Sequence, residues 1–371
     1  AQTAVELSKQ GKRVILVTKE TSPDDIHGMS AAAGLLTARG GRTSHAAVVG
    51  RQMGKVCVVG AEEIKVNIKN RNFSVKDKLI HEGDYISIDG FEGKVYKGDI
   101  PVVASEVIQV MQGDMKEIAS ERYGIFSTIL KWADSFKRLK IRTNADVPVD
   151  AEIAIKFGAE GIGLCRTEHM FFAEDRIKIM QDMILSTDTN SRIKELNKLQ
   201  EMQKKDFVGL FTAMKGFPCT IRLLDPPLHE FLPKREDLML EVKELEILDN
   251  NPDELRKKKA LLDRVEELHE FNPMLGLRGC RLGITMPEIT RMQVRAIFEA
   301  AIEVQKKKIK VLPEIMVPLV SMVTEIKFQK DIINDVAREV LGKKKINYMV
   351  GTMIEVPRAA AVADQIAKEA E

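Results

Sequence analysis

The sequence predicts an α/β protein in which a small α/β domain is followed by an incomplete TIM (β/α)8 barrel with a helical insertion. Three observations support this fold class. Short β-branched runs alternate with helical stretches through most of the 371 residues, as they do in parallel sheets. A purely helical stretch divides the alternation into a short and a long part. A second, highly charged helical stretch interrupts the long part and predicts the insertion.

Residues 1–100 are predicted to form the small domain. Its first residues, AQTAVELSKQGKR, have the pattern of an amphipathic helix, and Ser22-Pro23-Asp24 has the cap residue and proline that open another. The apolar runs predict three buried strands, at 13–18, 34–37 and 56–59. Apolar and polar residues then alternate around two glycines, which predicts a β-hairpin over 85–98.

Residues 101–138 are predicted to be a helical linker between the two domains. This stretch is mixed in charge, lacks the strand pattern of its neighbours and holds the only tryptophan, Trp132.

Residues 139–371 are predicted to form the barrel, because successive strand–helix units indicate a parallel sheet. The six candidate strands are 140–144, 161–166, 219–224, 273–278, 314–318 and 348–355. A TIM barrel needs eight strands, so two would follow Glu371, and the small domain is also expected to lack its opening strand. Residues 234–269 predict an antiparallel helical insertion, with a turn and a helix start at Asn250-Asn251-Pro252-Asp253.

The composition argues against several classes of protein, namely nucleic-acid binders, membrane proteins and disulfide-bonded proteins. A net charge of +2 argues against a dedicated nucleic-acid binder. No apolar run approaches the ~18 residues of a membrane span, so no membrane partner is expected. The four cysteines lie far apart without a CxxC pair, which favours free thiols in a soluble, reducing compartment, either the cytoplasm or an organellar matrix.

The segment GGRTSHAAVVGR, residues 40–51, is the first candidate site. Ser44 is expected to cap a helix whose first turn holds His45. Helix N-termini bind anions, phosphate above all, so an imidazole here suits a phosphohistidine intermediate. The alternative is a structural histidine in a capping loop.

The carboxyl ends of the predicted barrel strands form the second candidate site, because barrel enzymes place their chemistry there. Four such ends carry charged residues. Arg166 and Glu168 stand at the second strand, Arg222 and Asp225 at the third, Arg278 and Arg281 at the fourth, and Glu355 at the sixth. Several arginines suit a small substrate that carries phosphate and carboxylate groups. A single glutamate suits Mg²⁺, which takes one or two protein carboxylates. Each residue taken alone could equally form a structural ion pair.

Longer segments carry a family resemblance. GGRTSHAAVVGRQMGKVCVVG, residues 40–60, resembles the phosphohistidine domain of the enzymes that interconvert pyruvate and phosphoenolpyruvate. GAEGIGLCRTEHMFF and RLLDPPLHEFLP, together with NPMLGLRGCRLG and GTMIEVPRAA, resemble the pyruvate, phosphate dikinases in particular. The resemblance covers nearly the whole chain.

The resemblance implies a reversible conversion of ATP, phosphate and pyruvate to AMP, diphosphate and phosphoenolpyruvate. By matching motif, His45 is the phosphocarrier, Arg166 and Arg222 hold the phosphoryl group and substrate, and Glu355 is a Mg²⁺ ligand. Thr43 matches a threonine that is phosphorylated for regulation in some plant-type relatives.

The resemblance also implies parts that this sequence lacks. A nucleotide-binding domain before Ala1 would handle ATP, AMP, phosphate and diphosphate, and the small domain would swivel between that domain and the barrel. A second Mg²⁺ ligand and a proton-donating cysteine would follow Glu371. The sequence alone is therefore expected to be inactive in overall turnover, and the parent enzyme is expected to be a homodimer.

Two rival interpretations remain open at this point. The first is a phosphoenolpyruvate synthase, or a phosphocarrier that resembles enzyme I of the sugar phosphotransferase system and relays phosphate to a protein. The second is a catalytically inactive scaffold.

Overall fold

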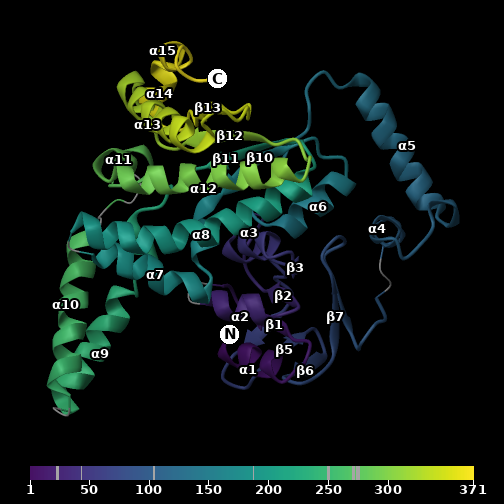
Figure 1. Ribbon diagram of the computed structural model, residues 1–371. Helices are drawn as coiled ribbons and strands as arrows, with labels where there is room; N and C mark the ends of the chain where they lie inside the picture. The colour runs from purple at the N-terminus through teal and green to yellow at the C-terminus, as the bar shows by residue number, and fades with distance from the viewer. Residues whose placement is uncertain are drawn as a thin grey trace. The chain divides into compact units, whose positions relative to one another are not determined.

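The computed structural model describes residues 1–21, 25–42, 44–102, 105–186, 188–248, 251–269, 272 and 276–371. The chain divides into two compact units, Ala1–Phe126 and Ser127–Glu371, which are described separately below (Figure 1).

The first unit is built on a three-stranded parallel sheet of order β1-β2-β3. Its strands and helices are β1 (Ile15–Thr18), β2 (Gly34–Thr37), β3 (Val56–Val58), α1 (Gln2–Lys9), α2 (Ile26–Ala31) and α3 (His45–Gln52). The three predicted strands and the first helix are confirmed. The predicted opening of a helix at 22–24 lies outside the described residues.

Two antiparallel sheets complete this unit. The predicted hairpin is confirmed, since β7 (Ile86–Asp89) pairs with β8 (Lys94–Lys97). A three-stranded meander was not predicted; its strands are β4 (Lys65–Asn67), β5 (Asn72–Val75) and β6 (Lys78–His81).

The predicted linker segment is helical. It contains α4 (Glu106–Gln112), the 3-10 turn η2 (Glu117–Ala119) and the longer helix α5 (Glu121–Phe136). The division between the two units falls within α5.

The second unit is built on a parallel sheet of order β13-β12-β11-β10-β9. The strands are β9 (Thr143–Asn144), β10 (Ile162–Arg166), β11 (Pro218–Arg222), β12 (Leu312–Val317) and β13 (Met349–Thr352). Neighbours in the sheet are neighbours in sequence, as in a (β/α) barrel. The predicted α/β fold class is therefore confirmed.

Helices connect each strand to the next and follow the last one (Figure 1). They are α6 (Pro148–Lys156), η3 (Thr167–Phe171), α7 (Glu174–Leu185), α8 (Thr189–Met214), η4 (Leu228–Phe231), α11 (Gly279–Thr285), α12 (Pro287–Lys306), α13 (Val323–Leu341), α14 (Pro357–Ala361) and α15 (Ala363–Ile366). Among the described residues, no helix is long and apolar enough to cross a bilayer.

One predicted strand, 273–278, is wrong as far as the structure describes it. Its first three residues lie outside the described residues, and 276–278 are not in a strand. β11 pairs directly with β12, so no strand lies between them. The physical reason lies in the start of α11, where the Gly279 amide donates to the Asp225 carbonyl (3.0 Å) and the Cys280 amide to the Pro318 carbonyl (3.0 Å). These bonds hold the chain against the loops after β11 and β12.

The helical insertion is confirmed as two helices, α9 (Arg235–Leu248) and α10 (Pro252–Leu268), which lie side by side (Figure 1). The Asn251 side chain caps α10 by accepting from the Glu254 amide at 3.2 Å. Ion pairs join the two helices, among them Lys258–Glu241 at 2.6 Å and Arg235–Glu266 at 2.9 Å.

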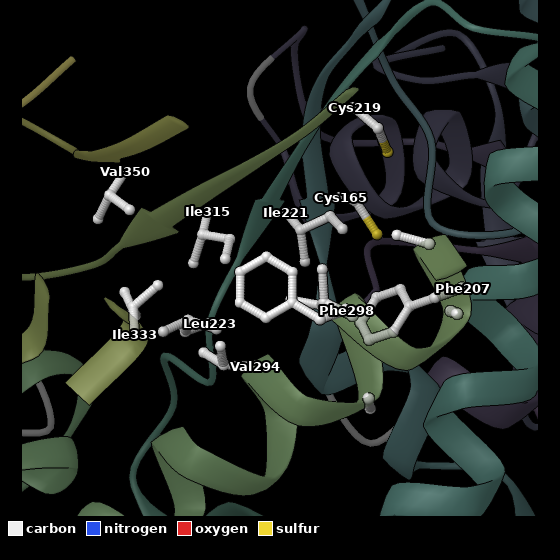
Figure 2. Packing of buried hydrophobic residues seen from close by; sticks show 14 of the residues in the cluster. Cys165, Phe207, Cys219, Ile221, Leu223, Val294, Phe298, Ile315, Ile333 and Val350 are labelled. Atoms are coloured by element: carbon white, nitrogen blue, oxygen red, sulfur yellow. The ribbon is translucent and has the colours of Figure 1, made fainter. Parts of the chain in front are cut away.

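The main core of the second unit fills one face of the sheet. Cys165, Ile221, Ile315 and Val350 are register partners across four strands, and all four are buried. Figure 2 shows Ile221 and Ile315 beside Phe298 of α12, with Phe207 of α8 nearby. Because side chains alternate along a strand, the residues next to this row point to the opposite face. Arg222 is one of them.

Candidate functional site

The loop between β2 and α3 carries the first candidate site. Ser44 has the extended backbone of an N-cap residue (φ −66°, ψ 156°), and its Oγ accepts from the Ala47 amide at 3.4 Å. His45 is the first residue of α3, as predicted. This places the imidazole at the positive end of the helix dipole. Thr43 lies outside the described residues.

Two glycines allow this loop to pack closely. Gly40 has φ +113°, and a Cβ there would lie 2.9 Å from the Ser44 side chain. Gly60, which follows β3, has φ +69°, and a Cβ there would collide with the Gly40 carbonyl oxygen. The loop that carries His45 is thus held against the segment after β3.

A threonine contacts the His45 ring. Thr21 Oγ1 lies 3.3 Å from His45 Nδ1, within hydrogen-bond distance. Since this contact engages Nδ1, Nε2 is the nitrogen left for attack on an electrophile. Thr21 was not predicted from the sequence, although its position three residues after β1 places it at the same sheet edge as the loop after β2.

The second candidate site lies at the carboxyl ends of the strands in the second unit. Arg166 and Arg222 are register partners at the ends of β10 and β11. Arg222 is only 8% exposed. Its guanidinium donates to the Glu168 carboxylate and lies 3.0 Å from Asp225 Oδ2. The structure therefore brings the two predicted arginines side by side.

Arg278, which is partly buried, joins three buried residues in a group that we call the strand-end cluster: Glu168, Arg222, Asp225 and Arg278. Arg278 donates through Nη2 to Asp225 Oδ2 at 2.9 Å and through Nε to the Asp225 carbonyl at 3.2 Å. Arg281, by contrast, donates to the Gly276 carbonyl at 2.7 Å.

Three atoms of the strand-end cluster are buried without a hydrogen-bond partner in the described part of the chain. They are Glu168 Oε2, Arg222 Nε and Asp225 Oδ1. Buried polar groups are nearly always hydrogen-bonded, so unsatisfied ones call for an explanation. A bound anion would satisfy the free Nε donor of Arg222.

Asp146 links Arg166 to His169. Its Oδ1 accepts from the Arg166 amide at 2.6 Å, and its Oδ2 lies 2.7 Å from His169 Nδ1. The hydrogen bond to Asp146 raises the pKa of His169. Burial alone would raise the pKa of Asp146, but the bonds from His169 and the Arg166 amide outweigh it and lower that pKa. Asp146 was not predicted from the sequence, although it follows β9 by two residues.

Glu355 follows β13 and is exposed. Its Oε1 accepts from the Leu319 amide, 2.8 Å away in the loop after β12. Two residues earlier, Met353 Sδ lies 3.9 Å from Arg222 Nη1, so the Glu355 loop borders the strand-end cluster. Within the described ranges, no three His, Cys, Asp or Glu side chains are grouped as metal ligands. A lone carboxylate is nevertheless compatible with Mg²⁺, which keeps waters and takes oxygens from its substrate.

Comparison with known proteins places the chain in a family. Residues 120–371 match the PEP-binding domain of the PEP-utilising enzymes, and residues 10–93 match their mobile domain. The chain belongs to the PEP-utilising enzymes.

The chain is also similar in sequence to individual members of this family, among them several pyruvate, phosphate dikinases. The chain is 52% identical over 371 residues to the pyruvate, phosphate dikinase of Rhizobium meliloti (strain 1021), covering 99% of this chain and 39% of the relative. It is 50% identical over 374 residues to that of Clostridium symbiosum (100% and 40%). It is 49% identical over 378 residues to the chloroplastic pyruvate, phosphate dikinase 1 of Arabidopsis thaliana (100% and 37%). The chain thus spans about two fifths of the length of these relatives.

Proposed function

We propose that this chain provides the phosphohistidine and phosphoenolpyruvate-binding parts of a pyruvate, phosphate dikinase. That reaction interconverts ATP, phosphate and pyruvate with AMP, diphosphate and phosphoenolpyruvate. The observation that carries the proposal is the presence, in one chain, of a histidine at a helix N-terminus and a buried arginine, Arg222, beside Arg166 at parallel strand ends. The names of the relatives support the choice of dikinase.

The proposed domain organisation is a swivelling phosphohistidine domain at 1–100, a helical linker at 101–138 and a barrel at 139–371. The boundary between the two compact units, at 126/127, lies within α5 and thus within the proposed linker. This supports the assignment of 101–138 as the segment that joins the two domains. The family matches also leave residues 94–119 between them.

In this proposal, His45 Nε2 attacks the phosphorus of phosphoenolpyruvate. An N–P bond forms while the bond from phosphorus to the enolate oxygen breaks, and the reverse step returns the phosphoryl group to pyruvate enolate. The Thr21 contact at Nδ1 orients the ring. Backbone N–H groups in the first turn of α3 stabilise the charge on the phosphoryl oxygens.

Arg222 and Arg166 are the proposed ligands of the substrate phosphate and carboxylate. The guanidinium forks suit both groups, and Arg222 is held in place by Glu168 and Asp225. Glu355 would hold Mg²⁺, which when bound stabilises negative charge on the enolate oxygen. Glu355 is already oriented by the Leu319 amide.

Other features of the complete enzyme are proposed from the family resemblance of the sequence alone. They are a nucleotide-binding domain for ATP, AMP, phosphate and diphosphate, a homodimer, and regulatory phosphorylation at Thr43.

The test uses the complete protein with radiolabelled phosphoenolpyruvate and Mg²⁺. We expect an acid-labile, base-stable protein adduct that AMP plus diphosphate discharge to form ATP. His45→Ala should abolish the adduct while the fold survives. An adduct that only a protein acceptor discharges would instead indicate a phosphocarrier of the enzyme I type.

A further inference from the structure

A buried glutamine on α12 contacts both strand ends that carry the substrate-binding arginines. Gln293 is 1% exposed. Its Nε2 donates to Thr167 Oγ1 at 3.0 Å, and its Oε1 accepts from the Leu224 amide at 2.8 Å. One side chain therefore bonds to the loop after β10 and to the loop after β11.

Thr167 extends this connection to Arg222. Thr167 is fully buried, and its Oγ1 donates to the Arg222 carbonyl at 2.9 Å. It stands between Arg166 and Glu168 in sequence, and the Glu168 carboxylate accepts from the Arg222 guanidinium. The backbone and the side chain of Arg222 are thus both held by the segment that Gln293 fixes.

The surroundings of Gln293 show why its polarity needs an explanation. Its neighbours Met292 and Val294 are buried in two apolar clusters, and Figure 2 shows Val294 and Phe298 of the same helix in the core. Burying an amide among apolar side chains is unfavourable unless its hydrogen bonds are made. The Nε2 and the Oε1 of this amide each form a hydrogen bond, one with the loop after β10 and the other with the loop after β11.

We propose that Gln293 is a positioning residue for Arg222, an inference that rests on the proposed function. Through Thr167 it fixes the carbonyl of Arg222, and directly it fixes the amide of Leu224, just before Asp225. This holds the strand-end cluster in the arrangement that accepts the phosphate-bearing substrate. Gln293 itself does not touch substrate.

The same helix offers a matched control. Thr290, one turn earlier on α12, donates to Gln329 Oε1 at 2.9 Å, and both residues are buried. This bond joins α12 to α13 and includes no strand-end residue. Thr290→Val therefore removes a buried hydrogen bond of similar kind without changing the contacts of Arg222.

The experiment compares Gln293→Leu with Thr290→Val in the complete protein. It measures the affinity for phosphoenolpyruvate, the thermal midpoint, and the rate at which phenylglyoxal modifies Arg222, followed by peptide mass spectrometry. Both variants should lower the midpoint by a few degrees. Only Gln293→Leu should also weaken binding, by about 10- to 100-fold, and speed modification of Arg222 about tenfold.

A second pair of variants keeps the test decisive if Gln293→Leu does not fold. Thr167→Val removes the hydroxyl that joins Gln293 to the Arg222 carbonyl, whereas Thr167→Ser keeps it. We expect the valine variant to reproduce the loss of affinity and the faster modification, and the serine variant to restore both.

Unchanged affinity and unchanged Arg222 modification, with only the midpoint lowered, would overturn the inference and leave Gln293 a structural residue. If the unaltered protein does not bind phosphoenolpyruvate, the proposed function fails instead. The Arg222 modification rate then decides the positioning role by itself.

Discussion

At His45 the two ring nitrogens have different surroundings. Nδ1 faces the Thr21 hydroxyl, while Nε2 is left for phosphoryl transfer in the proposed mechanism. A hydroxyl can donate to Nδ1 or accept from it, so Thr21 fixes the orientation of the ring in either tautomer.

Thr21→Val tests this contact. Losing one neutral hydrogen bond is worth about 1 kcal/mol, so phosphorylation of His45 by phosphoenolpyruvate should slow roughly fivefold. Rapid-quench measurement of adduct formation gives the rate. Thr21→Ser keeps the hydroxyl and should keep most of the rate; equal rates in all three proteins would rule out an orienting role.

The Asp146–His169 pair predicts a pH-dependent stability. Because the folded pKa of His169 is raised above its ordinary 6.5, its contribution is complete below about pH 6.5 and is lost as pH rises through the raised value. Because the pKa of Asp146 is lowered from 3.8, its contribution is lost as pH falls through that lowered value.

The thermal midpoint of His169→Gln should therefore lie below that of the unaltered protein, and the difference should be largest between about pH 4 and pH 6.5. The difference should shrink as pH rises further. Thermal unfolding at a series of pH values measures it, and a difference that does not change with pH would contradict the assigned pair.

Some residues of the candidate site could be predicted from the sequence, and others could not. His45, Arg166, Arg222 and Glu355 stand at helix starts or strand ends, where a local pattern predicts function. Gln293 gave no such signal, because a polar residue in a helix is usually exposed and its burial depends on two distant strands.

At the level of the elements, strands with β-branched apolar runs were predictable and polar ones were not. The meander β4–β6 was missed because its turns carry no glycine signal. Arg71 and Lys76 adopt positive φ (47° and 52°) there, although glycine is the usual residue for that conformation. The predicted strand at 273–278 is not formed at 276–278, the described part of the segment, which leads directly into α11.

The packing of α3 on the small sheet depends on Gly50. A Cβ at this position would collide with Cys57 Sγ of β3 and lie 3.0 Å from Leu35 Cδ1 of β2. Gly50→Ala should therefore lower the free energy of unfolding of the first unit by about 1–3 kcal/mol, despite the higher helix propensity of alanine.

Chemical denaturation measures this effect. Gly41→Ala is the control, because a Cβ at Gly41 meets no atom within 4 Å. If Gly50→Ala is as stable as the control, the close packing of α3 on β3 is not as described.

At the level of the whole molecule, each apolar cluster found among the described residues belongs to one unit. Two of these clusters lie within residues 4–95, and two lie within residues 145–366. Units with separate cores are expected to unfold separately.

Calorimetry of the chain should therefore show two transitions. Phe298→Ala removes a fully buried ring that packs edge-on against Tyr348, 4.9 Å between centroids. It should destabilise the second unit by about 3–5 kcal/mol and lower its midpoint by roughly 10 °C. The midpoint of the first unit should not move; a single transition that shifts as a whole would contradict separate cores.

The central claim is that His45 accepts a phosphoryl group from phosphoenolpyruvate. The most direct measurement is to incubate the complete protein with phosphoenolpyruvate and Mg²⁺ and to locate the phosphoryl group by peptide mass spectrometry at neutral to basic pH. The account predicts modification of the peptide that contains His45, lost in His45→Ala and slowed in Thr21→Val. A phosphoryl group on another residue, or none, would contradict it.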